Sequence, residues 1–142
     1  KSQQNKFPLM FIEKIISVIP GKELTAIKNF SYNEWFFPAH FEDEPNVPGF
    51  VQIECLAQAF ILTFLTKKEY QNYKTNFYNI TDAKFRRKII PGDVLKINAK
   101  LKNFNRGIAQ GYCEGFVGKD FACSGEFTVT VPLIFEKFIP KK

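Results

Sequence analysis

Residues 48–68 read PGFVQIECLAQAFILTFLTKK, and this stretch decides the fold. Its apolar residues recur at helical spacing and also fill much of the opposite side. Pro48 suits the first turn of a helix, where no backbone donor is needed. Lys67 and Lys68 suit the C-terminal end, where the helix dipole favours cations. We therefore predict one long helix here.

Three polar residues interrupt the apolar run: Gln52, Glu54 and Gln58. They leave no uninterrupted apolar stretch of about 18 residues, the length that a membrane-spanning helix needs. A helix that is apolar on nearly every face lies either in a membrane or in a protein core. We therefore predict a core helix wrapped by a sheet, with no membrane insertion.

The segments on both sides of this helix have the character of strands. A turn at Pro20 and Gly21 separates two strands before the helix, and glycine-containing turns separate the strands after it. Apolar and polar residues alternate over 94–101, as expected of a strand with one wet face. The predicted strands are 15–19, 23–30, 76–85, 94–104, 108–117 and 121–131. This order predicts an α+β domain whose sheet curls around the helix.

The composition is that of a single globular domain. The 142 residues are 45% hydrophobic and 24% charged, and they contain no repeat or linker. We expect one domain over residues 1–142, with a core at about 7–131 and a basic C-terminal tail at 132–142. The net charge of +6 suggests an acidic partner without identifying it. Nucleic acid is disfavoured because no recognition motif accompanies the charge.

The numbers of histidines and cysteines limit the kinds of metal site and catalysis that the chain can support. One histidine cannot build a multi-histidine metal centre, and the three cysteines form no C-x-x-C pair, so we expect no metal site. An odd cysteine number without disulfide-like spacing favours a reducing cytoplasm. The cysteines are Cys55, Cys113 and Cys123. If the protein uses a histidine in catalysis, that histidine is His40.

Candidate catalytic groups lie in residues 36–58. His40 stands in a proline-rich loop, 14 residues before Glu54 in the middle of the apolar helix. Burial disfavours a charged carboxylate, so we expect Glu54 to carry a proton near neutral pH, whereas a histidine accepts one there. Such a pair forms a general acid and a general base, and the helix N-terminus at Gly49 suits an oxyanion or a thioester carbonyl. A structural histidine and an ion-paired glutamate remain open alternatives.

Several runs of sequence carry a family resemblance. They are H-F-x-x-x-P-x-x-P-G at 40–49, IECLAQA at 53–59, and the segments 7–15, 33–37 and 83–93. Together they resemble FabZ-type (3R)-hydroxyacyl-[acyl carrier protein] dehydratases over about residues 7–131. The resemblance implies a hot-dog fold, with an antiparallel sheet around the central helix. It also implies homodimers or trimers of dimers with an active site shared between two subunits.

The resemblance further implies roles for particular residues. His40 would remove the proton α to the thioester, and the partner's Glu54 would protonate the departing 3-hydroxyl. The product would be a trans-2-enoyl thioester, formed without a cofactor. The Gly49 amide would hold the thioester oxygen. Gln58 lies one turn after Glu54, so it either orients that carboxylate or closes a polar gap in the dimer core.

A basic cluster lies at the end of the strand predicted at 76–85. It consists of Lys84, Arg86, Arg87 and Lys88. The resemblance implies that acyl carrier protein, which is acidic, docks near the mouth of the acyl tunnel. The cluster is therefore a candidate docking surface, and a solvated strand end is the alternative.

The residues next to His40 depart from the family pattern. Glu42 and Asp43 stand where the family usually has Pro-Gly, and Glu44 follows. Three carboxylates facing His40 would favour its protonated form and weaken it as a base. Two alternatives to dehydration stay open. One is an acyl-thioesterase, since proteins of the hot-dog fold include many thioesterases. The other is a non-catalytic protein that binds acyl carrier protein and whose site Glu42 and Asp43 have disabled.

Overall fold

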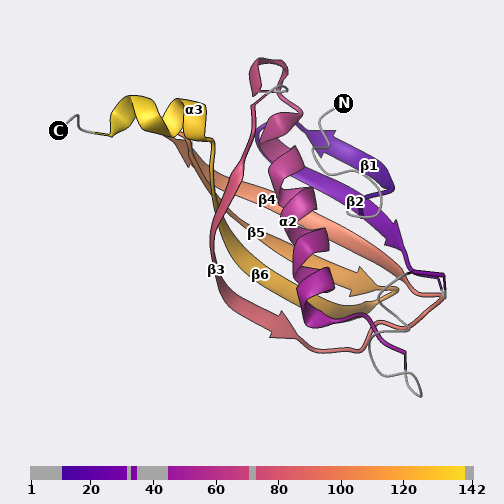
Figure 1. Cartoon of the computed structure of the whole chain (residues 1–142). Coiled ribbons are helices and arrows are strands. Elements are labelled where there is room, and N and C mark those ends of the chain that lie inside the picture. The colour runs from indigo at the N-terminus through magenta and orange to yellow at the C-terminus, as the bar shows by residue number, and fades with distance from the viewer. Residues whose placement is uncertain (1–10, 32, 35–44, 71–72, 140–142) are drawn as a thin grey trace.

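A six-stranded antiparallel sheet curves around one long helix in the computed structural model of the chain (Figure 1). The structure describes residues 11–31, 33–34, 45–70 and 73–139. Neighbouring strands follow the order β1-β2-β4-β5-β6-β3. The strands are β1 (Lys14–Ile19), β2 (Glu23–Asn29), β3 (Asn76–Phe85), β4 (Val94–Asn105), β5 (Ile108–Val117) and β6 (Asp120–Thr130). The helices are α2 (Gly49–Leu65) and α3 (Pro132–Phe135), with short 3-10 segments η1 (Lys68–Tyr70) and η2 (Glu136–Phe138).

The predicted strands agree with the observed ones. The bounds of β3 and β5 match the prediction, and those of the other four strands differ from it by one residue at one or both ends. Arg106 and Gly107 join β4 to β5 with φ angles of 54° and 78°. Two successive positive φ angles give the turn that suits the twist of a two-residue hairpin. The α+β arrangement predicted from the alternating patterns is confirmed.

The helix α2 is shorter than the stretch that predicted it. Pro48 is its N-cap rather than part of its first turn, and Gly49 is the first helical residue. At the other end, the Thr66 hydroxyl donates to the Leu62 carbonyl oxygen over 2.7 Å, so the helix closes before Lys67 and Lys68. Twelve of its 17 residues are buried, which confirms a core helix. No helix among the described residues is both long and apolar enough to cross a bilayer.

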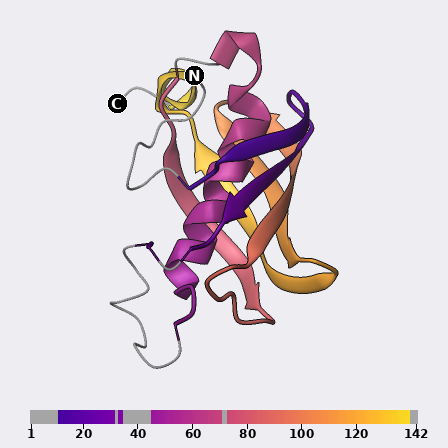
Figure 2. The ribbon, with the colours of Figure 1, turned by 90° about the vertical axis from the view of Figure 1, so that its right-hand side faces the viewer.

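The centre of the core is an aromatic cluster between α2 and the sheet. The ring of Phe60 stacks on that of Phe127, with centroids 5.8 Å apart, and meets Phe64 edge-on at 6.2 Å. Phe64 in turn packs edge-on against Phe104 at 5.1 Å. Offset and edge-on aromatic pairs stabilise a core beyond the area that they bury. In Figure 2 the sheet bends around α2.

One glycine permits the helix to lie this close to the sheet. A Cβ atom at Gly111 on β5 would collide with the backbone carbonyl of Lys100 on β4 and with the ring of Phe60. The glycine at this position therefore permits close packing of β5 against β4 and against Phe60.

A short C-terminal helical segment closes one end of the sheet. The stretch expected as a basic tail, 132–142, contains α3 and η2 in its described part. The Val131 amide donates to the Gly107 carbonyl oxygen over 2.8 Å, and the Phe135 amide donates to the Val131 carbonyl oxygen over 2.9 Å. These bonds attach the segment to the turn between β4 and β5.

The collision at Gly111 predicts a large loss of stability on adding one methyl group. We expect Gly111→Ala to lower the free energy of unfolding by about 3 kcal/mol, because the neighbouring carbonyl is backbone and cannot move aside. Gly118→Ala is the matched control: its φ is 60° with no atom within 4 Å of the added Cβ, so it carries only a left-handed backbone cost of about 1 kcal/mol. Urea unfolding of both variants measures the difference. Equal losses would contradict this account of Gly111.

Candidate functional site

The N-terminus of α2 is held against the chain that follows β3. The Val47 amide donates to the Ile89 carbonyl oxygen over 2.7 Å, and the Val47 carbonyl oxygen accepts from Gln52 Nε2 over 3.0 Å. Both bonds hold the residue just before the helix. The amides of Gly49 and Phe50 precede the first backbone bonds of the helix. Such amides, at the positive end of the helix dipole, suit a developing negative charge on oxygen.

A pocket of about 440 Å³ lies beside this helix end. Asn46, Val47, Gly49, Gln52, Phe85, Arg86, Arg87 and Lys88 line it. Gly49 packs beside the Phe85 ring: a Cβ atom at Gly49 would lie 3.4 Å from that ring, which is ordinary van der Waals contact. Phe85, which is 46% exposed, was not among the predicted site residues. A large apolar side chain at the exposed end of a strand was the feature that would have identified it.

Glu54 is half-buried on α2, and its carboxylate has a defined partner. Gln58 Nε2 donates to Glu54 Oε1 over 3.2 Å, so the contact expected one turn along the helix is present. The oxygen of the same side chain, Gln58 Oε1, accepts from the Phe11 backbone amide over 2.9 Å. Sequence patterns do not identify Phe11, because it contributes a backbone group 47 residues away from Gln58.

The other half of the predicted catalytic pair lies outside the described residues. His40 falls in the segment 35–44, as do the neighbouring Glu42, Asp43 and Glu44. The structure therefore brings together Gly49, with its pocket, and the Glu54–Gln58 pair on a single helix.

The predicted basic cluster divides into residues with different surroundings. Arg86 and Lys88 are exposed and line the pocket beside Gly49. Arg87 lines it too, but its guanidinium lies 3.2 Å from Asp120 Oδ2 and 3.9 Å from Asp93 Oδ2. Lys84 is exposed on β3 and is not part of the pocket wall. Arg87 therefore has local carboxylate partners that reduce the charge it offers to an incoming molecule.

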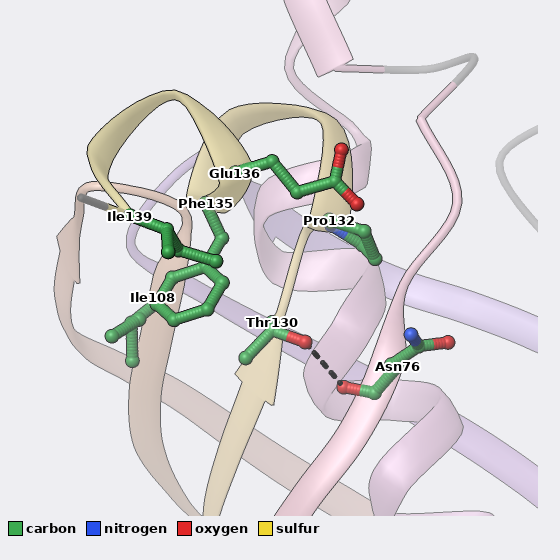
Figure 3. A pocket seen from close by; sticks show the side chains of 7 residues that line it. All are labelled: Asn76, Ile108, Thr130, Pro132, Phe135, Glu136 and Ile139. Atoms are coloured by element: carbon green, nitrogen blue, oxygen red, sulfur yellow. Dashed lines mark hydrogen bonds between the residues drawn. The ribbon is translucent and has the colours of Figure 1, made fainter. Parts of the chain in front are cut away.

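A second pocket lies at the other end of β3. Figure 3 shows its wall, where α3 and η2 fold over the ends of the strands. Asn76, Ile108, Thr130, Pro132, Phe135, Glu136 and Ile139 line it. Thr130 Oγ1 donates to the Asn76 carbonyl oxygen over 3.4 Å across this wall. None of the candidate residues from the sequence lines this mostly apolar pocket.

The three cysteines are buried and free of disulfides. Burial raises the pKa of Cys123 to about 12 and also raises the pKa values of Cys55 and Cys113. These thiols are therefore protonated near neutral pH and are poor nucleophiles. In the described part of the chain, no group of three or more histidine, cysteine, aspartate or glutamate side chains is placed to hold a metal ion.

Comparison with solved structures defines the fold class. The dehydratase heterocomplex ApeI:P from Xenorhabdus doucetiae matches with a TM-score of 0.76 over 96% of this chain and 93% of that chain, at 18% identity. This likeness, together with the curved sheet around one helix, confirms the predicted hot-dog fold.

Comparison of sequences identifies the family. The FabA-like domain model matches residues 4–126. The 3-hydroxyacyl-[acyl-carrier-protein] dehydratase FabZ of Lactobacillus helveticus is 37% identical over 128 residues, which cover 90% of this chain and 86% of that protein. The FabZ of Moorella thermoacetica is 32% identical over 127 residues and 89% of each chain. The chain therefore belongs to the FabA-like family and, within it, to the FabZ-type dehydratases that its motifs predicted.

The raised thiol pKa values predict slow reaction with disulfide reagents. Only the thiolate form of cysteine attacks a disulfide, and the pKa of each thiol is raised well above the pH of the assay. We therefore expect none of the three cysteines to react with Ellman's reagent at pH 8 within minutes. All three should react once urea unfolds the chain. The absorbance of the released dye counts the thiols in each state. Rapid reaction of any cysteine in the folded protein would contradict the burial described above.

Proposed function

We propose that this chain dehydrates 3-hydroxyacyl thioesters carried by acyl carrier protein, with His40 as the base and the partner's Glu54 as the acid. Membership of the FabZ-type family supports the reaction. The observation that carries the assignment of residues is the arrangement on α2, where Gly49 lines a pocket at the helix start and Gln58 donates to Glu54. The surrounding pathway is the biosynthesis of fatty acids or a related acyl chain.

The proposed reaction breaks two bonds and makes one double bond. His40 removes the proton from C2, and negative charge develops on the thioester oxygen, which accepts from the Gly49 amide. Glu54 gives its proton to the 3-hydroxyl, the C3–O bond breaks, and water leaves with the formation of a trans-2-enoyl thioester. Transfer of the proton from His40 back to Glu54 restores both groups. The chain supplies this chemistry without a metal or redox cofactor.

The face of α2 that carries Glu54 fits a shared site. Phe50 is 67% exposed, and Ile53 and Ile61 on the same helix are only partly buried. The outer edge of β3 is open as well, because β3 ends the sheet. A second copy covering these surfaces would bury apolar side chains and bring a partner's His40 to Glu54. We therefore propose a homodimer, alone or within a trimer of dimers.

The pocket beside Gly49 fits docking of an acidic carrier protein. Arg86 and Lys88 line the pocket that leads to the helix N-terminus. A cationic rim there would attract the carrier and orient its thioester arm. Of the four predicted docking residues, Arg87 contributes less because Asp93 and Asp120 pair with it. A cytoplasmic location completes the proposal, since three free cysteines suit a reducing compartment.

Removal of either proposed catalytic group should abolish dehydration. We expect His40→Ala and Glu54→Gln each to lower kcat by at least about 100-fold, because each removes one proton-transfer step. Glu54→Gln keeps the size of the side chain but supplies no acidic proton. Formation of the enoyl thioester from a 3-hydroxyacyl thioester, followed by ultraviolet absorbance at several chain lengths, measures the effect. Lys96→Gln, which changes an exposed side chain on β4, is the control.

Other outcomes would select one of the two alternatives. Release of free thiol without enoyl product would identify a thioesterase on this fold. Binding of acyl carrier protein without turnover of any thioester would identify a non-catalytic protein, and restoring Pro-Gly at residues 42 and 43 would then test whether those carboxylates had disabled His40. Undiminished turnover in His40→Ala would remove the histidine from the mechanism.

The docking proposal predicts a difference between large and small substrates. Arg86→Glu should lower kcat/KM about tenfold for the carrier-bound substrate, because it places a like charge against the acidic carrier. The same variant should leave turnover of an N-acetylcysteamine thioester, which has no carrier, nearly unchanged. High salt should shrink the loss. Lys96→Glu is the control, since Lys96 is exposed on β4, three strands from β3. An equal loss with both substrates would contradict docking at Arg86.

A further inference from the structure

A lysine points into the core at the end of β2. Leu24, Ala26 and Lys28 alternate with more exposed residues along this strand, so the strand geometry directs all three side chains inward. Lys28 is only 5% exposed. A buried ammonium group is costly unless carboxylates and hydrogen bonds compensate for its lost water. The groups that compensate for the burial of Lys28 are therefore also the groups that its ammonium holds in place.

Two carboxylates from different segments meet at Lys28. Its Nζ donates to Glu34 Oε1 over 2.7 Å and to Glu13 Oε1 over 3.0 Å. The rings of Phe30 and Phe11 lie below the ammonium, with centroids 5.4 and 5.9 Å from Nζ. Burial alone would lower the pKa of Lys28, but the bonds to Glu34 and Glu13 outweigh it and raise that pKa. Lys28 is therefore charged throughout the neutral range.

The Glu13 side of this cluster leads to Glu54. Glu13 follows Phe11 by two residues, and the Glu13 amide donates to the Ile27 carbonyl oxygen over 3.1 Å, beside Lys28. The Phe11 amide donates to Gln58 Oε1, and Gln58 Nε2 donates to Glu54 Oε1. A short chain of bonded groups thus joins the buried ammonium to the proposed catalytic acid.

The direction of the Gln58 amide follows from this chain. A backbone N–H can only donate, so it fixes Oε1 of Gln58 as the acceptor and leaves the NH₂ group for Glu54. In the proposed acid step, Glu54 therefore accepts from Gln58 while it delivers its proton to the substrate. If Phe11 moved, Gln58 could turn its oxygen toward Glu54 and oppose that arrangement.

The Glu34 side of the cluster leads toward the proposed base. Glu34 is the last described residue before the segment 35–44, which contains His40. Its amide donates to the Ser31 carbonyl oxygen over 3.2 Å, and its carboxylate is bound to Lys28. Glu34 is thus the second carboxylate that holds the Lys28 ammonium in place.

We propose that Lys28 is a positioning residue for the dehydration: bound by Glu13 and Glu34, it fixes the Phe11 backbone, which sets the direction of the Gln58 amide toward Glu54. This inference rests on the proposed function, because it assigns Lys28 a part in the same acid step. Lys28 does not touch the substrate, so its effect acts on kcat and passes through Gln58.

A double-mutant cycle between Lys28 and Gln58 tests the proposal. Lys28→Met and Gln58→Met should each lower kcat about tenfold or more and leave KM within about twofold. The double variant should be no slower than Gln58→Met, because residues that act through one network are not additive. Lys28→Arg keeps the charge and should recover most of the activity. Unchanged kcat in Lys28→Met, or losses that multiply in the double variant, would overturn the proposal.

Controls separate positioning from folding. Lys96→Met removes an exposed lysine on β4, opposite Ile27 and so beside Lys28 in the sheet, and should change nothing. Urea unfolding establishes that each variant is folded under the assay conditions. Where Lys28→Met fails to fold, Glu13→Gln replaces it in the cycle, since it weakens one partner and keeps the lysine. A Glu13→Gln effect that adds fully to that of Gln58→Met would overturn the proposal.

A spectroscopic measurement is independent of turnover. In ¹⁵N-labelled protein, the side-chain NH₂ signals of Gln58 should shift in Lys28→Met and stay in place in Lys96→Met. Unmoved Gln58 signals in Lys28→Met would overturn the proposed connection. If the wild-type chain turned over no thioester, the proposed function would fail, and the NMR result would still decide whether Lys28 fixes Gln58.

Discussion

The burial of α2 is the constraint on which the rest of the structure depends. A helix with apolar side chains around most of its circumference needs more than one flat face to cover it. The sheet meets this need by curving, so that strands β2, β4, β5 and β6 all contact the helix. Gly111 lets Phe60 approach the sheet closely, and the stacking of Phe60 on Phe127 fills the space that remains.

The same constraint determines where polar chemistry is permitted on the helix. Most α2 side chains face the sheet of their own chain, and the side with Phe50 and Glu54 is left partly uncovered. A carboxylate there avoids full burial but keeps a defined partner in Gln58. The helix that organises the core thus also presents the proposed acid, Glu54, and, at its first residue, the backbone amide of Gly49. The same helix, α2, therefore contributes to both the core and the candidate site.

Periodicity predicted most of this fold because helix and strand patterns are local. The bounds of β3 came directly from the residues of Asn76–Phe85. Lys28 was not predicted to be buried, although its strand alternates regularly. A lysine on the inward face suggests that the strand has been assigned the wrong face, unless the carboxylates that pair with the lysine are known. The bond from Phe11 to Gln58 joins residues 47 apart and involves a backbone group, so no side-chain pattern reports it. The four residues of α3 are too few to show a helical period.

The acid and the base of the proposed mechanism depend on different parts of the chain. Glu54 is supported by α2 and by Phe11, which is itself buried in the core. The departures from the family pattern, Glu42 and Asp43, lie instead next to His40. Carboxylates facing His40 would favour its protonated form, whereas the hydrogen bond between Gln58 and Glu54 is made by two groups on α2. In the proposed mechanism, sequence change beside His40 would therefore tune the base while α2 and Phe11 keep the proposed acid in place.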